Sequence, residues 1–251
     1  MTSAPSRNAI APTVAKLCVT GLAKRYGSLP VLQGIDLALE RRRATAILGP
    51  NGAGKTTLIK SILGLTSIDA GEILVDGRRI DESPAYRAAI GYMPQSARLP
   101  DNLTANDLIS LLTDMRGRTA TLDRTLVDAF RLGADLTKPL RMLSGGTRQK
   151  VNAVLAFLFG PDLLILDEPT AGLDPIASSI LKDKVLEERG RGRTIVLTSH
   201  VMNDLEELAD DVVFLLDGVV RFVGSLSDLK RRTRQLSLER AVAHLMREEA
   251  A

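Results

Sequence analysis

The sequence predicts an α/β fold with a mainly parallel sheet, an N-terminal antiparallel β region and a helical insertion. Three short apolar runs, residues 44–48, 163–166 and 194–198, each lead into a turn and then into a helical segment. Nearly continuous apolar strands followed by helices are typical of a parallel sheet that is buried on both faces. Ligands of such sheets bind beyond the carboxyl ends of the strands, so we expect one site at that edge.

The first part of the chain has the pattern of antiparallel strands. Apolar and polar residues alternate within residues 13–40, with Leu17 and Val19 in one run and Ile35 and Leu37 in another. This alternation is typical of antiparallel strands with one buried face. We therefore expect a separate β region ahead of the parallel sheet.

A strand–helix unit and a helical insertion follow. The strand at 44–48 leads through a glycine-rich turn into a helix from Lys55 to about Leu63. Residues 101–160 have few strand signals and carry apolar side chains at helical spacing, which predicts a helical insertion over about 96–160. The positions that show this spacing are Leu108, Leu111, Leu112, Leu122, Leu126 and Ala129.

The remaining segments complete the expected organisation. The third strand is followed by a helix from about Val201 to Ala209, and residues 226–251 have the pattern of one or two charged amphipathic helices. Residues 1–12 are rich in Ser, Ala and Pro, which favours a flexible tail. We therefore expect a tail at 1–12, a main domain at 13–225 and a C-terminal helical tail at 226–251.

Composition excludes several functional classes. The 251 residues include 45% hydrophobic and only 3% aromatic side chains, which disfavours stacking on single-stranded nucleic acid. Basic and acidic residues are interspersed and leave a net charge of +3, so we expect no nucleic-acid partner. No apolar run approaches the roughly 18 residues of a membrane span. The single cysteine, Cys18, lies in an alternating strand and is expected to be packed in the core.

A glycine-rich turn carries the strongest motif. Glycines allow successive backbone N–H groups to face phosphate oxygens, and the helix N-terminus adds a partial positive charge. Lys55 is expected to reach the β- and γ-phosphates, Thr56 to ligate Mg²⁺, and Thr57 to donate to the α-phosphate side. The motif has the form G-x-x-x-x-G-K-[ST] and comprises Gly49, Pro50, Asn51, Gly52, Ala53, Gly54, Lys55 and Thr56.

The second strand ends in two acidic residues. Asp167 at its tip is expected to hold Mg²⁺, and Glu168 to act as a general base or to orient a water molecule.

A third segment, Leu143 to Lys150, precedes an expected helix from Val151 to Phe159. It has two possible roles. Ser144 is a helix N-cap with Gly145 and Gly146 in a turn, or the same groups form a second anion site.

Taken together, these motifs resemble the nucleotide-binding subunit of an ATP-binding cassette (ABC) transporter, over about Val14 to Val223. The phosphate loop is similar to the family's Walker A motif, Leu143 to Gln149 to its signature, and Asp167 with Glu168 to Walker B. Four further positions match by their local sequence: Tyr26 as the adenine-stacking aromatic, Gln95 as the Q-loop glutamine, Asp174 as the D-loop aspartate and His200 as the switch histidine.

The resemblance implies a RecA-like P-loop core and an activity, the hydrolysis of ATP with Mg²⁺. It implies catalytic roles for Glu168, His200, Lys55 and Gln95, with Thr56, Gln95 and Asp167 at the metal. It also implies that two copies pair head to tail, so that Ser144, Gly145 and Gly146 of one copy face the ATP of the other. A membrane permease is the further implied partner, with the protein peripheral on the cytoplasmic face of the inner membrane.

One position departs from the family pattern, because Thr147 stands where the signature usually has Gln. The run from Ser144 to Asn152 is similar to ATPase subunits of the copper-processing transporter that accompanies nitrous oxide reductase maturation. The tail from Leu236 to Met246 is similar to that of ABC-2 export cassettes.

Two other functions stay open: a soluble ABC ATPase that acts on a macromolecular partner, and an unrelated phosphate-loop enzyme such as a small-molecule kinase.

Overall fold

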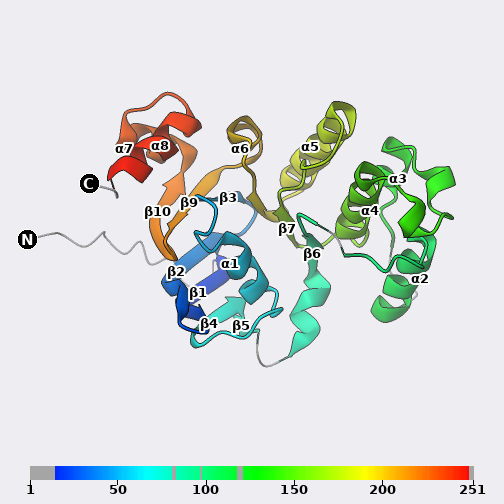
Figure 1. Cartoon of the computed structure of the whole chain (residues 1–251), viewed down its shortest axis with the longest axis horizontal. Coiled ribbons are helices and arrows are strands. Elements are labelled where there is room, and N and C mark those ends of the chain that lie inside the picture. Colours follow the sequence, from blue (N-terminus) through cyan, green and yellow to red (C-terminus); the bar gives the residue numbers. More distant parts are fainter. Residues whose placement is uncertain (1–14, 81–82, 97, 118–120, 249–251) are drawn as a thin grey trace, which may run out of the picture.

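The computed structural model describes residues 15–80, 83–96, 98–117 and 121–248 (Figure 1). The tail expected at residues 1–12 lies outside these described residues. The predicted α/β class is confirmed, because a six-stranded, mainly parallel sheet packs against a four-stranded antiparallel sheet and several helices.

The larger sheet has the strand order β10-β9-β3-β8-β7-β6, and only β10 runs antiparallel to its neighbour. The three predicted strands are confirmed as β3, β7 and β8. Sequence reasoning missed β6, which is only four residues long and contains Gly91, and the hairpin β9–β10. The strands are β3 (Ala44–Leu48), β6 (Ile90–Met93), β7 (Leu163–Asp167), β8 (Thr194–Thr198), β9 (Asp211–Leu216) and β10 (Val219–Ser225).

The smaller sheet has the order β2-β1-β4-β5 and confirms the antiparallel pattern of residues 13–40. Leu17 lies opposite Leu39, and Val19 lies opposite Leu37, all buried on one face. Cys18 lies between them and is only partly buried, so its expected place in the core is wrong: alternation turns it to the other face. The strands are β1 (Ala15–Tyr26), β2 (Leu29–Glu40), β4 (Ala70–Val75) and β5 (Arg78–Arg79).

Both faces of the larger sheet are covered. On β7, Leu163 and Ile165 point to one face and Leu164 and Leu166 to the other, and all four are fully buried. The first face packs against α1 (Lys55–Ile62) and the antiparallel sheet. The second face packs against α4, α5, α6, α7 and α8, where the larger hydrophobic cluster lies.

The helical insertion forms a lobe at one end of the molecule (Figure 1). Its expected helical character is confirmed, although two of the apolar residues that show helical spacing are exposed. Leu111 is half exposed on α2, and Ala129 is exposed because α3 is too short to bury a full stripe; Val127 and Phe130 are buried instead. The lobe contains α2 (Ala105–Arg116), α3 (Thr125–Ala129), α4 (Gly145–Phe157) and the 3₁₀ turns Gly133–Asp135 and Leu140–Met142.

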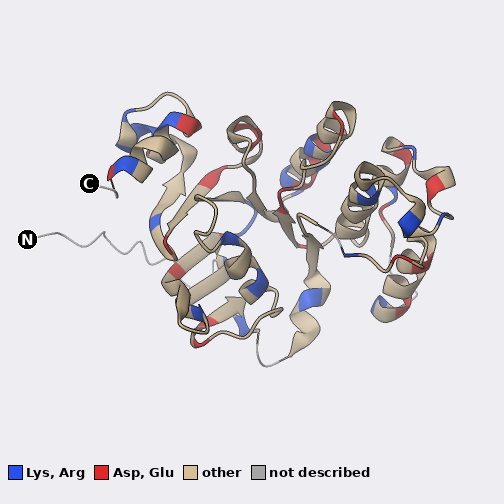
Figure 2. Ribbon diagram, viewed as in Figure 1, with Lys and Arg blue, Asp and Glu red and all other residues tan. Residues whose placement is uncertain are grey.

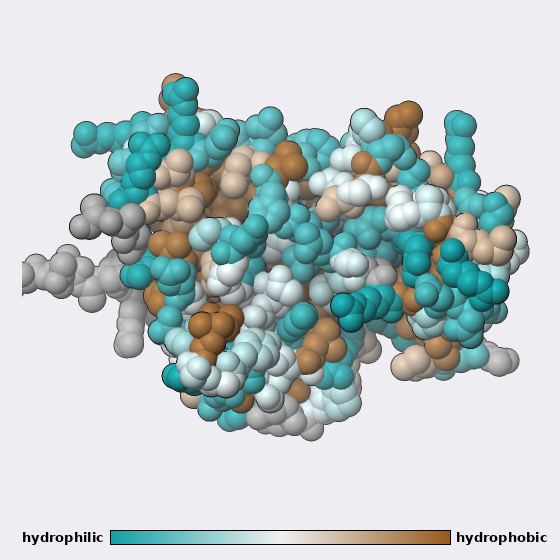
Figure 3. All heavy atoms as spheres, in the orientation of Figure 1, coloured by the Kyte–Doolittle hydropathy of each residue, from teal (hydrophilic) through white to brown (hydrophobic). Residues whose placement is uncertain are grey.

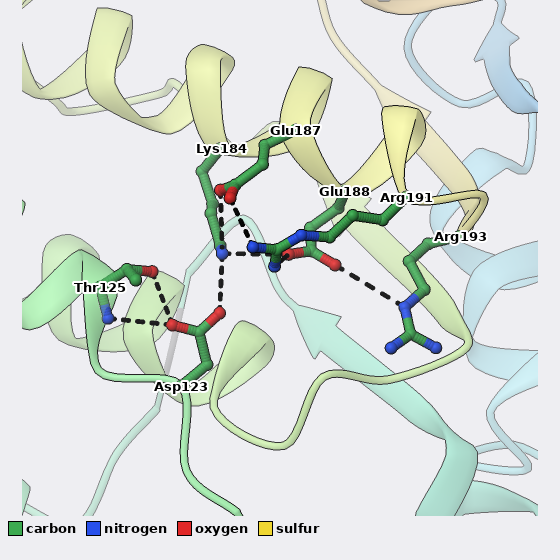
Figure 4. Close-up of polar contacts among 7 residues, drawn as sticks. All are labelled: Asp123, Thr125, Lys184, Glu187, Glu188, Arg191 and Arg193. Atoms are coloured by element: carbon green, nitrogen blue, oxygen red, sulfur yellow. Dashed lines mark hydrogen bonds and ion pairs between the residues drawn. The ribbon is translucent and has the colours of Figure 1, made fainter.

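An ion cluster centred on the buried Lys184 and Glu188 ties this lobe to α5 (Pro175–Gly190) (Figure 4). Lys184 on α5 is 4% exposed and lies 2.7 Å from Asp123, just ahead of α3, and 3.0 Å from Glu188. Burial alone would lower the pKa of Lys184, but hydrogen bonds to these carboxylates outweigh burial and raise it. The cluster comprises Asp123, Thr125, Lys184, Glu187, Glu188, Arg191 and Arg193.

The C-terminal segment forms two helices, α7 (Leu226–Thr233) and α8 (Leu238–Glu248), as its pattern predicts. They lie beside β10 at the end of the molecule opposite the helical lobe (Figure 1). The remaining helices are α6 (Met202–Leu208) and the 3₁₀ turn Pro84–Ala89.

Charges of both signs are interspersed over the elements (Figure 2), and hydrophobic side chains form small separate groups on the face shown in Figure 3. Within the described part of the chain, no helix is both long and apolar enough to cross a membrane.

Candidate functional site

The phosphate loop joins β3 to α1 at the carboxyl edge of the larger sheet, as predicted. Gly49 has φ 151°, and a Cβ added there would lie 2.0 Å from the Leu215 carbonyl oxygen on β9. Gly54 caps α1 with φ 103°, a backbone conformation that favours glycine. These two glycines therefore let the loop pass close to β9 and turn directly into the helix.

Lys55 spans this loop. Its Nζ donates hydrogen bonds to the carbonyl oxygens of Gly49 at 2.7 Å and Pro50 at 3.0 Å. Burial lowers the pKa of Lys55, and the charges of Glu168 and Asp167 only partly offset this effect. The ammonium therefore lies in the field of both acidic residues from the second predicted strand.

Asp167 ends β7 and is 5% exposed. It continues the series Leu163 and Ile165, whose side chains face α1, because alternate residues of a strand share a face. Its Oδ1 accepts a hydrogen bond of 2.6 Å from the hydroxyl of Thr198, its neighbour on β8. Burial of the Tyr92 hydroxyl is the main cause that raises the pKa of Tyr92 to about 12, and the negative charge of Asp167 raises it further.

Glu168 and His200 meet just beyond the strand ends. His200 Nε2 lies 2.7 Å from Glu168 Oε1; the His200 side chain is 52% exposed and that of Glu168 is 14% exposed. Glu168 has φ 51°, which is uncommon for a residue with a side chain and is frequent at functional sites. Thus the acidic residue of one strand and the histidine after the next strand form a pair at the edge where the site was expected.

The segment at Ser144 corrects one expectation. The helix α4 begins at Gly145, not at Val151, and neither Gly145 nor Gly146 has a positive φ, so they belong to the helix and form no turn. Ser144 is the N-cap: its Oγ accepts a hydrogen bond of 3.1 Å from the Thr147 N–H. The hydroxyl groups of Ser144 and Thr147 are also bonded at 2.8 Å.

A groove of about 540 Å³ lies between the helical lobe and the core. It brings Gln95, which is exposed, together with Gly145 of α4 and Gly172. Among the described residues that line it, none belongs to the phosphate loop or to the Asp167–Glu168 pair. The structure therefore joins the predicted Q-loop glutamine to the Ser144 segment, and it joins Lys55 to Asp167 and Glu168, as two separate groups.

Two other predicted residues lie at the margins. Asp174 is the N-cap of α5, accepting a bond from the Ala177 N–H at 2.8 Å, and it pairs with Lys150 of α4 at 2.8 Å. Tyr26, at the end of β1, is half exposed, with the ammonium of Lys24 5.4 Å from its ring centre. Its ring is therefore accessible to a ligand on one side of the molecule.

Comparison with known proteins identifies the family. The sequence pattern of the ABC transporter family matches residues 32–171, more than half of the chain. The chain belongs to the ABC transporter family.

Its relatives include named transport proteins. A Nod factor export ATP-binding protein of Ralstonia nicotianae is 35% identical over 208 residues, 80% of this chain but only 64% of that protein, which is less than two thirds. A lantibiotic transport ATP-binding protein of Streptococcus pyogenes is 32% identical over 204 residues, 81% of this chain and 88% of that protein. A daunorubicin resistance ATP-binding protein of Streptomyces coeruleorubidus is 35% identical over 222 residues, covering 86% and 70%.

Solved structures agree. The ATP-binding subunit of an ABC transporter is 34% identical, with a TM-score of 0.86 over 92% of this chain and 99% of that chain. A dimeric cassette solved in a post-hydrolysis state with ADP and phosphate has a TM-score of 0.73 over 84% of this chain and 98% of that chain; at 22% identity it shows the shared fold. The chain is therefore an ATP-binding cassette of an ABC transporter and an ATPase.

The side chains of this ABC ATPase fit a magnesium ion that is shared with a nucleotide. The described residues contain no cluster of three or more His, Cys, Asp or Glu side chains that could hold a metal by themselves. Mg²⁺ is usually bound by one or two carboxylates together with substrate phosphates and water, which matches a single buried Asp167 near the phosphate loop. The Thr56 hydroxyl would add a second donor, whereas Gln95 lies in the groove beside Gly145, which Asp167 does not line.

Sequence reasoning missed one residue of the ABC site, Thr198. It was assigned only to a strand, yet its hydroxyl contacts both Asp167 and the backbone N–H of Glu168. A polar residue at the tip of a parallel strand next to the acidic strand was the available signal, but the pairing of β7 with β8 is set only by the sheet order.

Proposed function

We propose that this ABC ATPase works as a head-to-tail dimer that powers a separate membrane permease of the export type. The observation that carries the dimer is the separation of the groove at Gly145 from the phosphate loop within one chain. The Glu168–His200 pair at 2.7 Å, at the sheet edge beside Lys55, supports the hydrolysis that powers the permease. Phosphoryl transfer depends mainly on positioning and charge stabilisation, and these residues supply both.

The proposed roles follow from charge and placement. The phosphate loop, Gly49 to Thr57, binds the phosphates with its backbone N–H groups, and Lys55 neutralises charge on the β- and γ-phosphates. Glu168 orients or deprotonates the attacking water, and His200 holds the γ-phosphate. Mg²⁺, when bound, would neutralise phosphate charge; Thr56 and Asp167 would hold it, and Gln95 would join them only by approaching from the groove beside Gly145. Tyr26 stacks on the adenine ring.

The dimer is supported by the separation of the Ser144 segment from the phosphate loop within one chain. The groove at Gly145 does not include the phosphate loop among its described lining residues. Ser144 with the N-terminus of α4 can bind an anion, yet this anion site is separate from Lys55 within one copy. In the proposed dimer, Ser144, Gly145, Gly146 and Asp174 of one copy complete the ATP site of the other.

Mixed dimers test this arrangement. Lys55→Ala removes the phosphate-loop cation, and Ser144→Asp keeps a good helix N-cap but places a carboxylate against the phosphate. Each variant alone is expected to be inactive, whereas a mixture regains ATPase activity, because mixed dimers contain one site with both intact halves. A mixture that stays as inactive as its components would refute the shared site. As the control, two samples of the same variant are mixed in the same way, and every dimer that forms lacks a site with both intact halves.

The export assignment rests on the relatives. Three of them are named for Nod factor export, lantibiotic transport and daunorubicin resistance. We further propose the ABC-2 export type, and within it copper-site maturation, which the run from Ser144 to Asn152 favours. The permease would hold the protein at the cytoplasmic face of the inner membrane.

Affinity purification from the native membrane tests the partner. A multispan permease in stoichiometric amount supports the proposal, and a periplasmic copper-site protein made with it would support the maturation role. A ribosome or another soluble assembly in place of the permease would favour the alternative, a soluble ABC ATPase that acts on a macromolecular partner.

A further inference from the structure

Thr198 ends β8 directly beside the end of β7. Its side chain has no exposed surface, and it is the register neighbour of Asp167 in the parallel pair. Alternation along β8 places Thr198 on the same face as Val196, which packs with the α1 cluster. The hydroxyl therefore lies on the sheet face that carries the phosphate loop and Asp167.

The Thr198 hydroxyl bonds to both acidic residues of the site at once. It donates its one proton to Asp167 Oδ1 at 2.6 Å and accepts the backbone N–H of Glu168 at 3.0 Å. The same N–H also reaches the Thr198 carbonyl oxygen at 3.2 Å. A hydroxyl group has one donor and two acceptor positions, so this arrangement uses the proton fully and leaves one lone pair.

These hydrogen bonds hold Glu168 in an unfavourable backbone conformation. Glu168 has φ 51°, which a residue with a side chain adopts only when its surroundings hold it there. The Glu168 N–H is fixed from Thr198 alone, by hydroxyl and carbonyl oxygen together. The direction in which the Glu168 side chain leaves the strand therefore depends on Thr198.

We propose that Thr198 is the positioning residue of this ATPase: its hydroxyl orients the Asp167 carboxylate toward the metal and holds Glu168 in line with the water. The proposal rests on the functions proposed above for Asp167 and Glu168. Thr198 has no exposed surface, so it acts through Asp167 and Glu168 and not by contact with the nucleotide. Groups that orient a metal-binding carboxylate in this way typically change metal affinity or activity 10- to 100-fold when removed.

Thr45 offers a matched control in the same sheet. It lies on β3, next to β8, and is 1% exposed, and residue alternation with Ile47 places it on the same face. Its hydroxyl has no hydrogen-bond partner among the described residues. Thr45→Val removes a buried hydroxyl without removing a bond, so it measures the effect of the chemical change alone.

The experiment compares Thr198→Val, Thr198→Ser and Thr45→Val in the full chain. For Thr198→Val we expect kcat to fall about 10- to 100-fold, with KM for ATP changed much less, because the phosphate loop is intact. Thr198→Ser restores the hydroxyl and should recover most of the rate, and Thr45→Val should match the wild type. A fluorescent ATP analogue, titrated with and without Mg²⁺, gives a readout besides activity: Thr198→Val should weaken the Mg²⁺-dependent gain in affinity.

Three results would overturn the proposal. They are an unchanged kcat in Thr198→Val, a Thr198→Ser variant as slow as Thr198→Val, or an equal loss in Thr45→Val. If Thr198→Val does not fold, the pair Thr198→Ala and Thr198→Ser decides in the same way. The two levels of inference are separable, because Glu168→Gln tests the role of Glu168 itself: a slow Glu168→Gln beside an unchanged Thr198→Val would reject Thr198 alone.

Discussion

His200 Nε2 lies 2.7 Å from Glu168 Oε1, although the two residues follow different strands of the larger sheet. The contact forms because β7 and β8 are parallel neighbours, so their carboxyl ends release both side chains at one edge. It places a carboxylate and an imidazole where the γ-phosphate would lie in the proposed site.

Glu168→Gln should preserve ATP binding and slow turnover by about 10²- to 10⁴-fold, the contribution expected of a general base. The amide keeps the size and the backbone of Glu168 but cannot accept the proton. ATP should then accumulate in a closed dimer, which size-exclusion chromatography detects as a shift from monomer to dimer when ATP is added. Turnover equal to that of the wild type would remove Glu168 from this role.

The affinity for ATP should fall with rising pH earlier than an ordinary lysine would allow. Burial lowers the pKa of Lys55 below its ordinary value of 10.5, and only the protonated form attracts phosphate. The dissociation constant for Mg²⁺-free ATP should therefore rise below pH 10.5, measured by equilibrium dialysis between about pH 7 and pH 10. Circular dichroism confirms folding at each pH. The control Lys60→Gln, exposed on the same helix, should follow the wild-type curve; a constant affinity over this range contradicts the prediction.

Lys184→Met should destabilise the fold by about 1–3 kcal/mol, because the partly buried Asp123 loses its cation while the buried Glu188 keeps its ion pair with Arg191. Urea unfolding followed by circular dichroism measures the loss. The control is Lys182→Met, which lies on the same helix as Lys184. It breaks ion pairs with the partly exposed Glu207 and Asp204 of α6 and should cost about 1 kcal/mol or less. Equal losses in the two variants would show that the cluster in Figure 4 does not stabilise the junction.

The Lys184→Met effect should also depend on pH. Burial alone would raise the pKa of Asp123, but hydrogen bonds from Lys184 and Thr125 outweigh it and lower the pKa below 3.8. A lowered carboxyl pKa contributes stability above the unfolded value and loses it as the pH falls through the folded value. The difference between wild type and Lys184→Met should therefore shrink below pH 3.8.

Thr147→Val should reduce kcat/KM by about 2- to 10-fold, the equivalent of one hydrogen bond. The valine keeps the backbone N–H that caps α4 through Ser144 but loses the hydroxyl bonded to Ser144 at 2.8 Å. The free Ser144 hydroxyl is then less well oriented toward the partner's nucleotide. Thr147→Ser should restore the rate, measured by phosphate release, and a Thr147→Ser rate as low as that of Thr147→Val would count against this explanation.

Much of the fold was predictable because its signals are local. The apolar runs at 44–48 and 194–198 became strands within their expected bounds, since a strand buried on both faces must be apolar throughout. The start of α4 was misplaced by six residues, because Gly145 and Gly146 usually weaken helices, and only the Ser144 cap in the structure shows that the helix begins there.

The candidate site was predictable only in part. The phosphate loop and the Asp167–Glu168 pair are contiguous motifs, and the resemblance to ABC proteins added Tyr26, Gln95, Asp174 and His200. Their proposed catalytic roles remain predictions. Asp174 directly before Pro175 is a sequence signal for a helix N-cap, but its ion pair with Lys150 is not visible in the sequence, because that contact joins α4 to the start of α5.

The amino-acid sequence by itself determined the α/β class, the phosphate loop and the family, because each depends on residue types at short, fixed spacing. Only the tertiary structure decided which distant groups meet: Thr198 with Asp167 and Glu168, Lys184 with Asp123, and Gln95 with the start of α4. The reason is physical. Such contacts depend on the order in which strands pair and on how the helical lobe packs against the sheet, and neither is encoded in any local pattern.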